Sequence, residues 1–161
     1  MSTPLHPLIV HFPPVLLLVA GVFYILGWAM KRPGLDIIAF CLHAAGLVAC
    51  IAAIFTGDFE ADRFNSDAQL HELIERHESL VMIATYAFGM LGLWAFLRQK
   101  SGILLERIGF LIAFWAVTGV LLIGAHRGGI LVYEHGVGVS SNIGPQEAVN
   151  PSNPTKSLEQ Q

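Results

Sequence analysis

Four long apolar stretches alternate with polar connections along the chain, at residues 8–30, 35–55, 79–97 and 108–124. Each has close to the roughly 20 residues that an α-helix needs to cross the hydrocarbon core of a bilayer. Pro33 and Gly34 break the chain between the first two stretches, and a polar run at residues 98–102 separates the last two. Connections this short join antiparallel neighbours. The pattern predicts an all-α integral membrane protein, an antiparallel four-helix bundle within residues 1–139.

The longest connection, residues 57–78, ends in an amphipathic stretch. Ser66 has a side chain suited to an N-cap. Glu72 and Arg76 stand four residues apart and would support each other on one helix face. We therefore expect an amphipathic extension before the third membrane helix, continuous with that helix. Residues 140–161 are rich in Gly, Ser, Asn and Pro, which predicts a disordered tail.

Composition supports a chain that is solvated by lipid. Hydrophobic residues make up 54% of the sequence and charged residues only 13%, about half the charged fraction of a soluble domain. The net charge of -3 provides no basic surface, so we expect no nucleic-acid partner. No Lys or Arg precedes the first apolar stretch, which argues against a cleaved signal peptide.

Basic residues predict the orientation in the membrane. The two short connections, with the residues that flank them, carry Lys31, Arg32, Arg98, Lys100 and Arg107, whereas the opposite face carries mostly Asp and Glu. Cytoplasmic loops of membrane proteins have an excess of Lys and Arg. The short connections should therefore be cytoplasmic, and both termini, the long connection and the tail should be outside.

Three histidines fall near one level, close to the predicted outer surface: His11, His77 and His126. Ionisable side chains in membrane segments are candidates for function. Two imidazoles from facing helices can bind a six-coordinate haem iron. With sequential packing, the first and third helices lie on one diagonal, so His11 and His77 are expected to point into the bundle as axial ligands. His126 is the substitute or the ligand of a second site.

A purely structural role remains open for each histidine, because an interfacial imidazole can cap a carbonyl or face water. His43 lies deep in the second span without a histidine at its depth, so a buried hydrogen bond is favoured over a role as ligand. His71 is expected to be exposed, and His6 to be a turn residue beside Pro7. Cys41 and Cys50 are nine residues apart in one apolar run and are expected to act as small apolar side chains.

Two segments carry a family resemblance. The chain opens with His-Pro-Leu-Ile-Val-His-Phe-Pro at residues 6–13, and Gly-Gly-Ile-Leu-Val-Tyr-Glu-His-Gly-Val-Gly-Val follows the last span at residues 128–139. Together with Thr56-Gly57-Asp58 and the histidine of the third helix, they resemble a bacterial membrane-protein family known as domain of unknown function 2231. The resemblance implies a four-helix bundle in a bacterial inner membrane. It also implies an association with c-type cytochromes, which some relatives carry as fused or adjacent modules.

These observations predict a small b-type cytochrome or haem-bearing subunit, with one haem b or two, that transfers electrons near the outer face of the membrane. The sequence contains no nucleophile–base pair or phosphate loop, so no independent catalysis is expected. Two alternatives remain: a cofactor-free accessory subunit of a larger complex, and a membrane protein that binds a metal through its outer histidines.

Overall fold

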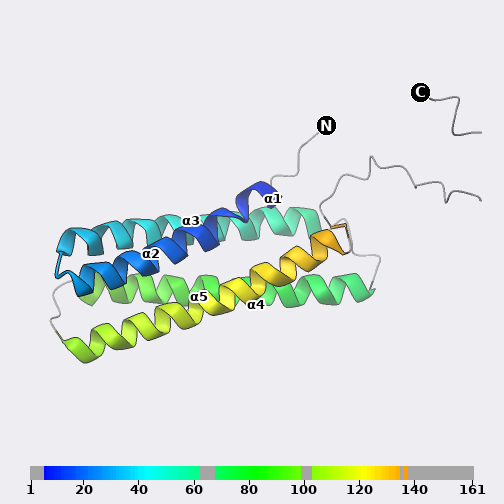
Figure 1. The fold of residues 1–161 in the computed structure, drawn as a ribbon. Coiled ribbons are helices and arrows are strands. Elements are labelled where there is room, and N and C mark those ends of the chain that lie inside the picture. Colours follow the sequence, from blue (N-terminus) through cyan, green and yellow to red (C-terminus); the bar gives the residue numbers. More distant parts are fainter. Residues whose placement is uncertain (1–5, 62–67, 99–102, 135, 138–161) are drawn as a thin grey trace, which may run out of the picture.

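The computed structural model describes residues 6–61, 68–98, 103–134 and 136–137. These residues form one helical turn and four long helices: α1 (His6–Ile9), α2 (Phe12–Ala29), α3 (Pro33–Ala61), α4 (Ala68–Leu97) and α5 (Leu104–Tyr133). The long helices run alternately in opposite directions (Figure 1). All four spans are long and apolar enough to cross a membrane. The predicted four-helix membrane bundle is confirmed.

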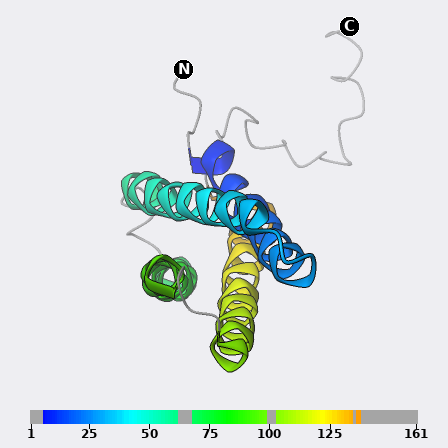
Figure 2. The ribbon, with the colours of Figure 1, turned by 90° about the vertical axis from the view of Figure 1, so that its left-hand side faces the viewer.

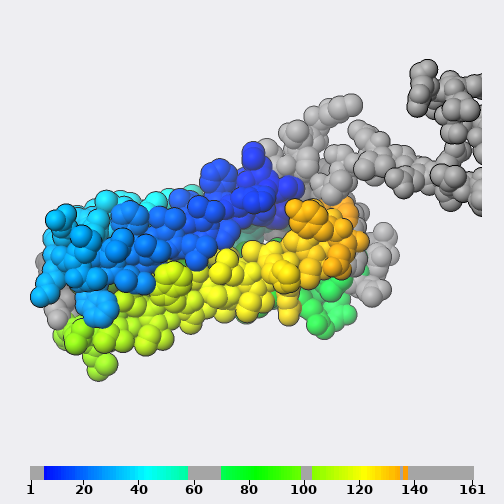
Figure 3. Space-filling view, viewed as in Figure 1, coloured from blue at the N-terminus to red at the C-terminus, as the bar shows by residue number. Residues whose placement is uncertain are grey.

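The long helices pack in the order of the sequence. α2 contacts α3, α3 contacts α4, α4 contacts α5, and α5 returns to α2. Figure 2 views this arrangement from the end at which α2 joins α3, and Figure 3 shows α2 and α5 side by side. The first and third spans, α2 and α4, therefore occupy one diagonal, as predicted. The short α1 packs against α3.

Two helix boundaries differ from the predicted spans. α4 begins at Ala68 and continues without a break to Leu97, which confirms the amphipathic extension; Ser66, its predicted N-cap, lies outside the described residues. α5 continues to Tyr133, well past the predicted end at Gly124. The reason is a small apolar cluster in which Leu131 of α5 packs on Leu70 and Ile74 of the extension. The predicted disordered tail, residues 140–161, also lies outside the described residues.

The first span is divided near its start. α1 ends at Ile9 and α2 begins at Phe12, with His11 at its N-cap. Pro13 and Pro14 follow in the first turn, where the missing backbone donors cost least. The division separates the two histidines of this segment, since His6 belongs to α1 and His11 to the junction.

The core lies in the middle of the bundle and is largely aromatic. Phe88, Phe110 and Phe114 are fully buried with Leu17. A Cβ at Gly21 would lie 2.9 Å from Cζ2 of Trp115, so the glycine lets α2 approach α5. Thr118 satisfies its buried hydroxyl by donating to the Phe114 carbonyl at 2.8 Å.

Polar contacts hold the end of the bundle that carries the short connections. Nη2 of Arg107 donates to both carboxylate oxygens of Asp36, and so joins α5 to α3. Nε1 of Trp94 donates to Glu106 at 3.1 Å, which joins α4 to α5. The Arg98 guanidinium stacks 4.3 Å from the centroid of the Phe110 ring. Three of the four long helices are thus tied together at this end.

Candidate functional site

The opposite end of the bundle, where α1 lies, α4 begins and α5 ends, is called the histidine end here. His77 of α4 is half-buried and faces α5. Its Nδ1 lies 2.8 Å from the Gly124 carbonyl oxygen. A carbonyl only accepts, so Nδ1 carries the proton and Nε2 carries the lone pair. The main chain of α5 therefore fixes both the tautomer and the ring orientation of His77.

Gly128 makes room for the His77 ring. A Cβ at this position would lie 2.8 Å from Cε1 of His77, closer than real side chains approach one another. Gly128 is one turn beyond Gly124 on α5, so one glycine accepts the hydrogen bond and the next gives the ring its space. The His77 ring therefore accounts for the glycine at position 128.

His6 has a similar arrangement on the other side of the bundle. Its Nδ1 lies 3.1 Å from Oγ1 of Thr56. The single hydrogen of the Thr56 hydroxyl is directed at the carbonyls of Ala52 and Ala53, at 3.0 and 3.1 Å. With the hydrogen there, the hydroxyl oxygen accepts from Nδ1–H of His6. The proton is again on Nδ1, and Nε2 carries the lone pair.

The surroundings of His6 also match those of His77. Cε1 of His6 would lie 3.1 Å from a Cβ at Gly57, so a glycine of α3 lies against this ring as well. α1, which carries His6, packs on α3, and α3 packs on α4, which carries His77. The prediction that His6 is only a turn residue is wrong: it opens α1 and bonds to α3.

His11 lies at the junction of α1 and α2 with its side chain exposed. Nδ1 donates to the Pro7 carbonyl at 2.7 Å, one turn earlier in the same segment. Nε2 of His11 therefore also carries the lone pair. The exposed position differs from the expected inward orientation, because the break before Phe12 lets the side chain leave the helix face that α2 presents to the bundle.

His43 lies in the middle of the bundle and is only 1% exposed. Nε2 donates to the Phe88 carbonyl at 3.0 Å, which leaves Nδ1 to accept from the Tyr24 hydroxyl at 3.3 Å. The Phe88 and Phe114 rings pack edge-on against the imidazole. Both ring nitrogens thus have protein partners, as in a buried histidine that hydrogen-bonds three helices together.

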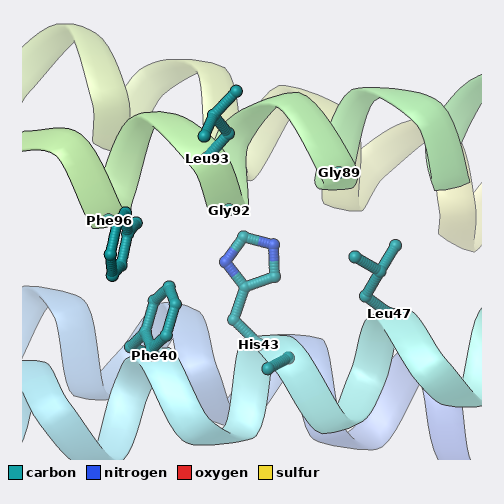
Figure 4. Close-up of a pocket in the computed structure, with 8 residues that line it drawn as sticks. Phe40, His43, Leu47, Gly89, Gly92, Leu93 and Phe96 are labelled. Carbon is teal, nitrogen blue, oxygen red and sulfur yellow. The ribbon is translucent and has the colours of Figure 1, made fainter.

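A pocket of about 250 Å³ lies beside His43, between α3 and α4. Figure 4 shows the His43 ring directed at the backbone of α4 near Gly92, with Phe40 and Phe96 on one side. The remaining lining residues are Ala44, Leu47, Gly89 and Leu93. The pocket walls are almost entirely apolar, and the polar atoms of His43 are directed to Phe88 and Tyr24 instead.

The other histidines are further from the bundle interior. His126 is exposed on α5. His71 is exposed on the α4 extension, as predicted, with Nε2 3.3 Å from a carboxylate oxygen of Glu75. His135 lies outside the described residues. Over the described ranges, no three His, Cys, Asp or Glu side chains come together in a way that could hold a metal ion.

Comparison with known proteins places the chain in a family. The family described as "Predicted membrane protein (DUF2231)" matches residues 2–141, which is most of the sequence. The chain belongs to this family. No curated protein and no solved structure matches it. The family assignment confirms the resemblance of the two end segments, and it agrees with the four membrane spans.

Proposed function

We propose that this protein binds haem b at the histidine end and transfers electrons between this haem and a partner protein. His77 would hold the haem iron, together with a histidine of the N-terminal segment, which carries His6 and His11. The observation that carries the proposal is the state of the His77 ring. Its Nδ1–H is held by the Gly124 carbonyl, so Nε2 presents the lone pair that an iron ligand needs.

The donor chemistry fits haem. A porphyrin supplies four nitrogens to its iron, so two imidazoles complete the coordination. Histidine ligands of metals almost always donate their second N–H to a carbonyl or carboxylate, which orients the ring and raises its basicity. His77 and His11 hold Nδ1–H in such a bond to a main-chain carbonyl, and Nδ1 of His6 bonds to the Thr56 hydroxyl. The bound haem would supply one-electron chemistry, and the residues of this chain would orient it and set its surroundings.

The proposed orientation places the histidine end outside the cytoplasm. Lys31, Arg32, Arg98 and Arg107 belong to the opposite end, which the positive-inside rule assigns to the cytoplasm. We propose that the membrane is a bacterial inner membrane with both termini outside. A water-soluble c-type cytochrome is then a suitable partner, because it could approach the histidine end directly.

An absorption spectrum of the purified protein tests the function. Bound haem gives a Soret band and sharp α and β bands on reduction. His77→Ala should abolish the six-coordinate spectrum. His71→Ala is the matched control, because His71 is an exposed histidine of the same helix and should leave the spectrum unchanged.

The same experiment separates the alternatives. A wild-type protein that takes up no haemin would contradict the proposal and favour a cofactor-free accessory subunit or a site for a bare metal ion. His126→Ala tests the third candidate ligand. Because His126 is exposed on α5, its removal should leave the spectrum intact, and loss of one haem in two would assign it to a second site.

A further inference from the structure

We infer that His6, and not His11, is the second axial ligand opposite His77. This inference rests on the proposed haem site and specifies its ligand pair. Both histidines of the N-terminal segment carry the lone pair on Nε2, so the tautomer does not distinguish them. Their positions and their supports do.

Position favours His6. Its side chain is half-buried, and α1, which carries it, packs on α3, which in turn packs on α4, the helix of His77. The His11 side chain is exposed at the junction between α1 and α2. An iron bound by His6 would lie at a half-buried ring, whereas one bound by His11 would lie at an exposed ring.

Support favours His6 as well. Nδ1–H of His6 donates to Thr56, and the Thr56 hydroxyl donates onward to the α3 main chain at Ala52 and Ala53. The ring is therefore held by a different helix, 50 residues away in the sequence. His77 is likewise held by α5, 47 residues away. His11 is held only by Pro7, four residues before it, so its bond does not fix the ring relative to the bundle.

The space around the two rings follows the same pattern. Gly57 lies against Cε1 of His6, and Gly128 lies against Cε1 of His77. Each ring thus has a hydrogen-bond acceptor and a glycine on one neighbouring helix. His6 lies between α1 and α3, and His77 lies between α4 and α5, so a metal bound by both histidines would join the two halves of the bundle.

Reconstitution with haemin tests the inference. The full-length wild type and the His6→Ala, His11→Ala and His77→Ala variants are purified in detergent, titrated with haemin and reduced with dithionite. We expect the wild type and His11→Ala to share one low-spin, six-coordinate spectrum. His6→Ala should give a high-spin, five-coordinate spectrum, and added imidazole should restore the low-spin form by occupying the vacated position.

His6→Met covers the case in which His6→Ala is not recovered as folded protein. Methionine still offers a ligand, and a change from His/His to His/Met ligation raises the midpoint potential of a haem. A raised potential with a retained six-coordinate spectrum supports the inference.

The outcomes distinguish a wrong ligand assignment from a wrong haem proposal. If His11→Ala loses the low-spin spectrum and His6→Ala keeps it, the ligand pair is His11 and His77, and the inference is overturned while the haem proposal stands. If both single variants keep the wild-type spectrum, the inference is also overturned. If the wild type binds no haemin, the proposed function fails, and the ligand assignment fails with it.

Discussion

The contact between Gly128 and His77 allows a test of the site geometry that does not depend on any cofactor. In Gly128→Ala, the new Cβ would lie 2.8 Å from Cε1 of His77, whereas carbon atoms are comfortable at about 3.5–4.0 Å. The ring must move by roughly 0.7 Å or more. Starting from 2.8 Å, a shift of that size away from α5 stretches the bond to Gly124 to about 3.5 Å, beyond the usual range for N–H···O bonds.

Gly129→Ala provides the matched control. A Cβ at Gly129 meets nothing within 4 Å, and both glycines lie in the same turn of α5. Each substitution gains about 1 kcal/mol of helix propensity, which cancels between the two variants. The lost hydrogen bond of a partly buried imidazole costs about 1–3 kcal/mol. Gly128→Ala should therefore be less stable than Gly129→Ala by about 1–3 kcal/mol.

The measurement is reversible unfolding in mixed micelles, with SDS titrated into the detergent and helix content followed by circular dichroism. Gly129→Ala should equal or exceed the stability of the wild type. Equal stability of the two alanine variants would refute the reasoning, because it would mean that the His77 ring does not rest on Gly128. Introducing His77→Ala into both backgrounds sharpens the comparison: without the ring, the two glycine substitutions should become equivalent.

Two further predictions concern other parts of the chain. His43→Ala should lower the free energy of unfolding by about 2–4 kcal/mol, because it leaves the Tyr24 hydroxyl without its acceptor and opens a cavity among packed rings. The haem content of the protein should not change. Loss of part of the haem would instead indicate a second, deeper site. The orientation can be tested in a protein whose Cys41 and Cys50 are replaced by alanine. A membrane-impermeant thiol reagent applied to cells from outside should label a cysteine introduced at position 150 and not one at position 32. The reverse pattern would contradict the orientation assigned from the basic residues.

The helices were predictable because their signal is local. Four apolar stretches of membrane length lie in the sequence with their polar connections, and each forms most of one long helix of the bundle. The end of α5 was harder to predict. Gly128 and Gly129 have the composition of a helix terminus, but Leu131 reaches the cluster with Leu70 and Ile74, and this contact keeps the segment helical.

The candidate site depends on long-range contacts that cannot be inferred from the residue types in the sequence. The partner of His77 is a main-chain carbonyl on another helix, and no residue type marks that position. For His6, the neighbouring Pro7 suggested a turn, while the side chain that holds the ring, Thr56, is 50 residues away. Spacing indicated the depth of each histidine, but the direction of each ring followed only from the packing of the helices.

The length of the helices bears on how a partner could reach the histidine end. α3, α4 and α5 contain 29, 30 and 30 residues, or about 45 Å each at 1.5 Å per residue. The hydrocarbon core is about 30 Å thick and the bilayer with its headgroup layers about 40–45 Å, so about 15 Å of each helix lies beyond the core, at the level of the headgroups. The charged extension of α4 is the part suited to project, and the apolar cluster around Leu131 keeps it upright against α5. The apolar packing of the bundle therefore continues past the hydrocarbon core, and under the proposed function a soluble partner would reach His6 and His77 through the headgroup layer.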